Sequence, residues 1–277
     1  TNSITQGEQV GVLWSWMLSQ GIHIQFAHRT FSWSNEARGN ATVHCVIIGF
    51  GLHDYPTKTI YEYADIKGIP LAVPAKNINP YLVDAPDIVP PRRNTPICDV
   101  PAIGIGNKPI DDGNYLFSTE ERDAFITLEP KSEKWFRRWL GAAEFLNGYE
   151  RWCLWLGDCS PSELRTMPEV LKRVQAVKNS RLASKSPPTR KLADTPTRFH
   201  VEFIPTSPYL VIPAVSSERR DYIPLGYLEA STLGSNRLLL LPTAGLAEFG
   251  VLCSSMHNAW MRYTCGRLES RYNYSNT

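Results

Sequence analysis

Apolar and polar positions along the chain follow patterns that predict a mixture of helices and strands. After Gly7, apolar residues recur at helical spacing up to Gly21, which predicts a helix over this stretch. Strands are expected next over 22–26 and 43–50, and the second is a continuous apolar run typical of a buried strand. The aromatic and charged segment between these two strands is expected to be an irregular loop, of the kind that often carries function.

The middle of the chain is rich in turns before it returns to regular structure. Seven prolines between residues 76 and 110 predict that elements there are short. Helices are expected from Thr119 and over 135–146, and a strand is expected over 151–156.

The region 161–200 combines a predicted helix with a local excess of positive charge. Pro168 suits the first turn of a helix, and the apolar side of that helix comprises Val170, Leu171, Val174 and Val177. The region holds nine Lys or Arg against three Asp or Glu. A solvated face is the common explanation of such a run, but contacts with nucleic-acid phosphates fit its concentration somewhat better. The candidate phosphate contacts are Lys172, Arg173, Lys178, Arg181, Lys185, Arg190 and Arg198.

Two later apolar stretches, YLVIPAV and YIPLGYL, predict strands on either side of a charged tip, SSERRD at 216–221. Arg219 and Arg220 have the chemistry to pair with guanine, and Glu218 can accept a hydrogen bond from cytosine N4. A polar turn with a local ion pair explains the same residues, and spacing alone slightly favours it. A last helix is expected to begin with Ser254 or Ser255 as its N-cap.

Composition narrows the class of protein. The chain has 277 residues, 43% of them hydrophobic and 20% charged, which is enough to bury a substantial core. Its net charge is only +2, so a nucleic-acid partner requires a local basic surface. The apolar run Leu238–Leu241 is too short to span a bilayer, and no membrane association is expected. Six scattered cysteines without CxxC spacing fit reduced thiols of a cytoplasmic protein, and with six histidines they form no metal-ligand array.

Three further patterns favour structural interpretations. Asn79-Pro80-Tyr81 resembles the Asn-Pro-Pro-aromatic turn of amino-methyltransferases but lacks one proline, so an ordinary turn is expected. Gly104-Ile105-Gly106 lacks the third glycine of a phosphate-binding loop. The tryptophans of two aromatic patches are expected in the core: Trp135, Trp139, Trp152 and Trp155.

Seven ordered blocks, covering nearly the whole chain, resemble the MmeI-like DNA methyltransferases. The blocks are TNSITQGEQV, FAHRTFSWSNEARGNATVHCVIIGF, EFLNGYERWCLWL, LRTMPEVLKRV, RLASKSPPTRKLADTPTRF, VSSERRDYIPLGYL and SSMHNAWMRYTCGRL. Members of this family are large bacterial enzymes, some with an endonuclease. Their Rossmann-like domain uses S-adenosylmethionine to methylate adenine N6, and a target recognition domain then reads DNA.

The resemblance implies an α+β (mixed α/β) fold in three parts. Residues 1–77 would be the C-terminal part of the methyltransferase domain, 78–252 the target recognition domain, and 253–277 the start of a C-terminal helical segment. The S-adenosylmethionine loop and the amine-holding turn are expected upstream of Thr1. The chain alone is therefore expected to bind no cofactor and to be inactive.

The resemblance also implies a partner and a pocket. The partner would be double-stranded DNA, within a site-specific methyltransferase that is part of a restriction-modification system. A base that is methylated must leave the duplex and enter a pocket with aromatic walls. The family motif places Phe31 in this pocket, with Trp33 as the second choice. The rival interpretations are an RNA-directed methyltransferase and a non-catalytic interaction domain.

Overall fold

The N-terminal part of the molecule is a four-stranded sheet with one helix on it. The computed structural model describes residues 2–33, 43–93, 95–268 and 270–275. A short 3-10 helix and α1 precede the strands, and the sheet order is β2-β1-β3-β4. Their bounds are η1 Ser3–Thr5, α1 Glu8–Ser19, β1 His23–Trp33, β2 Val43–Gly51, β3 Lys58–Glu62 and β4 Leu71–Ala75. The helix predicted between Gly7 and Gly21 is thereby confirmed, and its buried side chains Val10, Trp14 and Met17 form a core with Ile24, Ala27 and Ile60.

The prediction of an irregular loop after residue 26 is wrong for the first part of that segment, because β1 continues to Trp33. Phe31 and Trp33 pair with Cys45 and Val43 of the antiparallel neighbour β2. The backbone N–H of Ser32 also donates to the carbonyl of Ile66 at 2.7 Å. These long-range hydrogen bonds outweigh the polar local sequence. The rest of the expected loop, 34–42, lies outside the described residues.

The expectation that the strand at 43–50 is buried is also wrong, although its position is right. β2 is an edge strand, paired with β1 on one side only among the described strands. Ile47 and Phe50 are 48% and 52% exposed. The continuous apolar run therefore forms an open edge and face of this sheet.

A second part is built on the sheet β12-β7-β8-β6, whose core contains the buried Trp139 and Trp155. The strands are β6 Leu116–Phe117, β7 Phe136–Leu140, β8 Trp152–Leu154 and β12 Thr232–Gly234. The helical elements are α2 Thr119–Leu128, η2 Pro130–Trp135, α3 Ala142–Asn147, α4 Pro161–Leu164, α5 Pro168–Ala183, α6 Pro187–Lys191 and η3 Leu192–Asp194. The helix from Thr119 is confirmed, with Ser118 and Glu121 forming a capping box at its start.

The helix predicted over 135–146 is wrong in its first half. Phe136–Leu140 is strand β7, held between β8 and β12, and the helix begins only at Ala142. Phe136, Trp139 and Leu140 are buried in the cores on either side of this strand, and this packing outweighs the helical propensity of the stretch.

A third sheet, β11-β9-β13-β5, lies in the middle of the molecule, and every residue of β9 and β13 is buried. Its strands are β5 Gly104–Ile105, β9 Tyr209–Pro213, β11 Gly226–Leu228 and β13 Leu238–Leu241. A small sheet, β10-β15-β14, comprises Val215–Ser216, Arg271–Asn273 and Gly266–Leu268. The helices here are α7 Leu246–Cys253 and α8 Ser255–Thr264, and Ser254 is the N-cap of α8, as the sequence predicted.

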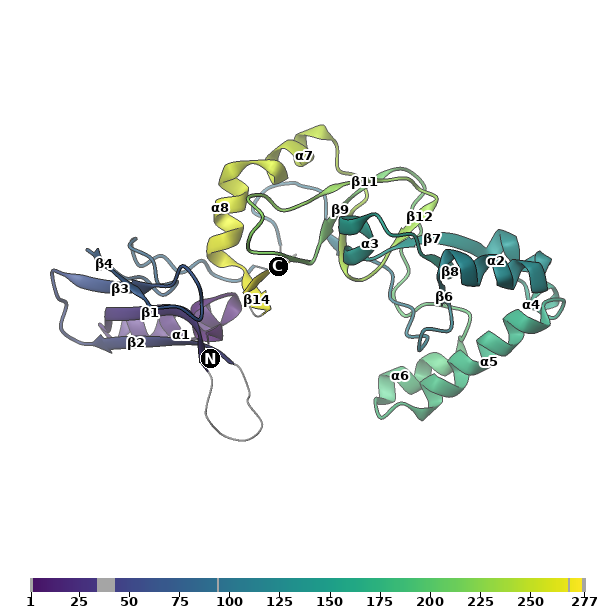
Figure 1. Cartoon of the computed structure of the whole chain (residues 1–277), viewed down its shortest axis with the longest axis horizontal. Coiled ribbons are helices and arrows are strands. Elements are labelled where there is room, and N and C mark those ends of the chain that lie inside the picture. The colour runs from purple at the N-terminus through teal and green to yellow at the C-terminus, as the bar shows by residue number, and fades with distance from the viewer. Residues whose placement is uncertain (1, 34–42, 94, 269, 276–277) are drawn as a thin grey trace.

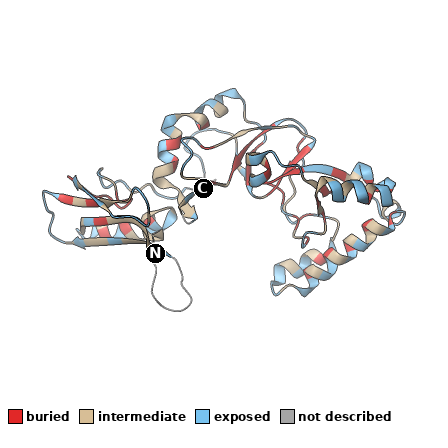
Figure 2. Ribbon diagram, in the orientation of Figure 1, coloured by how far each residue is buried: buried red, intermediate tan, exposed pale blue. Residues whose placement is uncertain are grey.

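These parts follow one another along the long axis of the molecule (Figure 1). The β1–β4 sheet with α1 lies at one end, α2 and α4–α6 lie at the other, and α7 and α8 lie between them. Figure 2 shows buried residues in each part separately, which agrees with several distinct hydrophobic clusters. The mixed α/β fold class predicted from the sequence is confirmed. No helix in the described part of the chain is long and apolar enough to cross a membrane.

Candidate nucleic-acid interface

A cleft of about 860 Å³ lies where the β1–β4 sheet meets α8 and β14. One side comes from β1, the end of β3 and the turn after β3, including Arg29, Glu62 and Tyr63. The other side comes from the turn at Glu218 and Arg219, together with residues of α8 and β14. The cleft is therefore shared between segments far apart in the sequence.

The junction beneath this cleft depends on the Asn79-Pro80-Tyr81 turn. Asn79 is fully buried, and its Oδ1 accepts a hydrogen bond from the backbone N–H of Tyr81 at 3.1 Å. Its Nδ2 donates to the hydroxyl of Tyr263 on α8 and to the carbonyl of Pro86. The rings of Tyr81 and Tyr263 lie 4.3 Å apart, and burial raises the pKa of Tyr81 to about 12. The triplet is a turn, as predicted, and it attaches α8 to the linker that leaves the N-terminal sheet.

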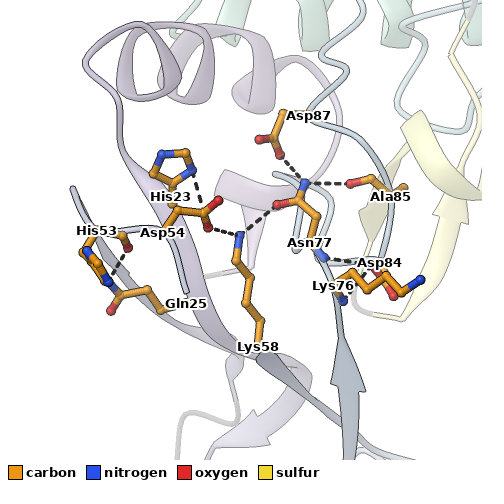
Figure 3. A network of polar contacts seen from close by, with 10 residues as sticks. All are labelled: His23, Gln25, His53, Asp54, Lys58, Lys76, Asn77, Asp84, Ala85 and Asp87. Carbon is orange, nitrogen blue, oxygen red and sulfur yellow. Dashed lines mark hydrogen bonds and ion pairs between the residues drawn. The ribbon is translucent and has the colours of Figure 1, made fainter. Parts of the chain in front are cut away.

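A buried lysine stabilises the start of this linker, two residues before Asn79 (Figure 3). Lys58 on β3 is 2% exposed, and its Nζ lies 2.9 Å from an oxygen of Asp54 and 2.9 Å from Oδ1 of Asn77. Asn77 in turn donates to Asp87 and to the carbonyl of Ala85. A buried ammonium requires such partners because its desolvation is costly. The network therefore holds the linker against the sheet.

This network gives a pH-dependent prediction for the Asp54→Asn variant. The hydrogen bond from Lys58 holds the pKa of Asp54 below its usual range. A lowered carboxyl pKa contributes stability above about pH 4 that is lost as the pH falls through the folded-state pKa. We expect Asp54→Asn to lower the melting temperature at pH 7, and the difference from wild type to shrink below about pH 4. Asp99→Asn, which removes an exposed carboxylate, is the control, and a difference that is the same at pH 7 and pH 3 would contradict the assignment.

Phe31 belongs to an aromatic cluster that reaches the cleft through Tyr63. The ring of Phe31 stacks on Tyr63 with centroids 5.3 Å apart, and its edge meets His28 at 6.3 Å. Nδ1 of His28 is hydrogen bonded to the Tyr63 hydroxyl at 2.8 Å, and the His28 ring stacks on Tyr61 at 4.2 Å. Burial lowers the pKa of His28, which favours a neutral ring at neutral pH. Tyr63 lines the cleft, so Phe31 supports one of its walls.

Trp33 has fewer contacts than Phe31. It ends β1 opposite Val43 and is 50% exposed. No ring contact of Trp33 is seen among the described residues, and the segment that follows it lies outside them.

The charged tip at 216–221 is part of a long connection and not of a tight hairpin. β9 pairs with β11 as expected, but β10 leaves this sheet and pairs with β15. Glu218 and Arg219 line the cleft. Arg220 does not, and its Nη1 lies 3.5 Å from the hydroxyl of Ser216.

Arg181 is the clearest correction among the candidate phosphate contacts. It is 1% exposed, and its guanidinium donates hydrogen bonds to five backbone carbonyls. The acceptors are the carbonyls of Pro109, Ile110, Leu192, Thr195 and Arg198. Because arginine has five N–H donors, none is left for a phosphate. Arg181 therefore joins α5 to the 109–110 turn and to the segment after α6.

The other candidate phosphate contacts of residues 161–200 differ in whether their side chains already have partners within the protein. Arg173 covers the rings of Phe117 and Phe125 and donates to the carbonyl of Asn114, so its role is largely packing. Three more are exposed but already have partners: Lys172 pairs with Glu169, Arg198 pairs with Glu202, and Arg190 donates to the carbonyls of Ser184 and Lys185. Lys178 and Lys185 are exposed, and their side chains make no ion pair with the described residues.

The cleft contains residues that the sequence did not single out. Tyr63, Lys67, Arg262 and Arg267 line it. They come from the turn after β3, from α8 and from β14, which are far apart in the sequence. Gly104 and Ile105 form strand β5, and a Cβ at Gly106, the residue after the strand, would lie 2.2 Å from the carbonyl oxygen of Ser235. Among the described residues, no cluster of His, Cys, Asp or Glu could hold a metal ion. All six cysteines are free thiols.

Comparison with known protein families matches an N-terminal segment and the larger remaining segment to two domains of one kind of enzyme. Residues 84–277 match the family described as "MmeI, target recognition domain", and residues 1–62 match "MmeI, DNA-methyltransferase domain". DNA methyltransferase A of Bacillus subtilis (strain 168) is 38% identical over 275 residues, which is 99% of this chain and 31% of that protein.

A solved structure agrees with these matches. The Type IIL restriction-modification enzyme MmeI, in complex with DNA, is 55% identical with a TM-score of 0.95, and the match covers 99% of this chain and 37% of that one. The chain thus spans about a third of the length of these relatives.

Proposed function

The chain belongs to the MmeI family of DNA methyltransferases, with its larger part in the target recognition domain, and from this we propose that it reads double-stranded DNA for a site-specific adenine-N6 methyltransferase. The observation that carries the proposal is the match to MmeI bound to DNA, with a TM-score of 0.95 at 55% identity over both segments. The full-length protein would be a restriction-modification enzyme that uses S-adenosylmethionine as methyl donor.

We assign three segments within this proposal. Residues 1–77 form the C-terminal part of the methyltransferase domain, 78–252 the recognition domain, and 253–277 the start of a helical segment. The open edge of β2, with half-exposed Ile47 and Phe50, supports the first assignment, because such an edge suits continuation of a larger sheet.

S-adenosylmethionine would be held by residues outside this chain. In the glycine-containing stretch that invited comparison with a cofactor loop, Gly104 and Ile105 are paired with β13, and there is no space for a side chain at Gly106. We therefore assign no step of the reaction to a cofactor site in these residues, and expect this chain by itself to be inactive.

Two measurements on the full-length protein test the proposal. Sequencing of DNA from cells that express it should reveal methylated adenine at one recurring sequence, and cells without the gene should lack it. In competition binding, duplex DNA should displace a labelled duplex better than structured RNA of equal length. Absence of methylated adenine would reject the reaction, and stronger competition by RNA would favour an RNA substrate.

A further inference from the structure

The cleft between the N-terminal sheet and α8 has an excess of positive charge. Five cationic and three acidic side chains line it. The cations are Arg29, Lys67, Arg219, Arg262 and Arg267, and the acids are Glu62, Asp65 and Glu218. Because the whole chain carries a net charge of only +2, this concentration is local.

Three of the five cations are already engaged by the protein. Arg29 pairs with Glu62 at 2.9 Å. Arg262 donates to the carbonyls of Arg220 and Asp221 at 2.7 and 2.6 Å. Arg267 lies 4.3 Å over the ring of Tyr272 and donates to the carbonyl of Ser270.

The remaining two, Lys67 and Arg219, are exposed, and their side chains make no ion pair or hydrogen bond with the described residues. The positive charges of these two side chains are therefore available to a ligand. A phosphodiester is the nucleic-acid group that such free cations bind, whatever the base sequence.

The backbone on either side of the cleft is held firmly, although these two side chains are free. The turn that carries Lys67 is closed by the N–H of Gly68 donating to the carbonyl of Asp65 at 2.7 Å, and it is joined to β1 through Ser32 and Ile66. The backbone N–H of Arg219 donates to the hydroxyl of Ser217 at 3.2 Å. The two bonds from Arg262 then fix this turn to α8.

From this arrangement we propose that Lys67 and Arg219 each bind a backbone phosphate of the DNA. Lys67 does so from the side of the N-terminal sheet, and Arg219 does so from the opposite side of the cleft. The proposal rests on the proposed function and deepens it by assigning its phosphate contacts. The neighbouring carboxylates of Asp65 and Glu218 repel a phosphate, which restricts the backbone to the two free cations. Such contacts carry no base information, and they fix the position of the duplex relative to the sheet and to the recognition domain together.

The test is the salt dependence of duplex binding by the full-length protein. Lys67→Ala and Arg219→Ala should each reduce the slope of log K against log salt by about 0.9, and the double variant by about twice that. Affinity should fall by the same factor for a duplex with the methylation site and for one without it. Lys131→Ala removes an exposed lysine of η2 that makes no ion pair with the described residues, and it should leave the slope unchanged.

Melting temperatures of the variants should equal that of wild type, because both side chains are exposed. Lys67→Gln and Arg219→Gln provide a second pair, which removes the charge but keeps a polar side chain. Slopes equal to wild type in both variants would overturn the proposal, and so would a loss of affinity confined to the cognate duplex. A wild-type protein without salt-dependent DNA binding would instead reject the proposed function, and this inference with it.

Discussion

Replacing Arg181 with methionine is expected to destabilise the recognition part of the chain by roughly 3–5 kcal/mol. Its five hydrogen bonds measure 2.7 to 3.0 Å and reach carbonyls of residues 109–110 and 192–198. Methionine fills similar space and donates to none of them. Buried carbonyls that lose their donor cost about 1–3 kcal/mol each before water or local movement compensates.

The measurement is urea unfolding followed by tryptophan fluorescence, since Trp139 and Trp155 lie in the same core as α5. Lys178→Met, on the same helix but exposed, is the matched control and should change stability by less than about 0.5 kcal/mol. Arg181→Lys keeps the charge but has only three donors without a planar fork, so it should recover little of the loss. Wild-type stability together with a weaker salt slope in Arg181→Met would return this residue to the phosphate contacts.

The role of Arg181 shows which part of a site local sequence can predict. Val170, Val174 and Val177 are buried as their spacing predicted, and Arg181 continues the same spacing by one more turn. This helical spacing could have indicated from the sequence that the side chain of Arg181 faces the core. What it meets there could not be predicted, because its acceptors lie in two turns up to 72 positions away.

The same dependence on partners outside the local sequence explains the two wrong predictions, a loop after residue 26 and a helix starting at residue 135. β7 and the second half of β1 are strands because distant partners pair with them, and neither has a strong local strand pattern. The cleft likewise depends on α8 meeting the linker through Asn79 and Tyr263, 184 positions apart. Elements with a local period or cap were predicted better: α1 has nearly the predicted bounds, and α2, α5 and α8 begin close to where the sequence predicted.

In the full-length enzyme, Phe31→Ala is expected to slow methyl transfer by roughly 5- to 150-fold while duplex affinity stays nearly unchanged. We propose Phe31 as an aromatic wall of the pocket for the flipped adenine, and loss of base stacking on such a ring costs about 1–3 kcal/mol. Phe31 itself does not line the cleft: it lies directly behind Tyr63, which does, so stacking on Phe31 requires the base to enter beside Tyr63 or to displace its ring. The rate should be measured in single turnover, so that product release does not mask the chemical step.

The rival explanation is that Phe31 only supports Tyr63 and the β1–β2 pairing, and Phe31→Leu separates the two. Leucine keeps most of the apolar volume but has no flat π face, so a stacking role predicts slow transfer at a normal melting temperature. A supporting role predicts that Phe31→Leu is nearly as active as wild type, and that Phe31→Ala loses melting temperature and activity together. If both variants transfer methyl at the wild-type rate, the pocket role belongs elsewhere. Trp33, half exposed at the end of the same strand, is then the residue to replace.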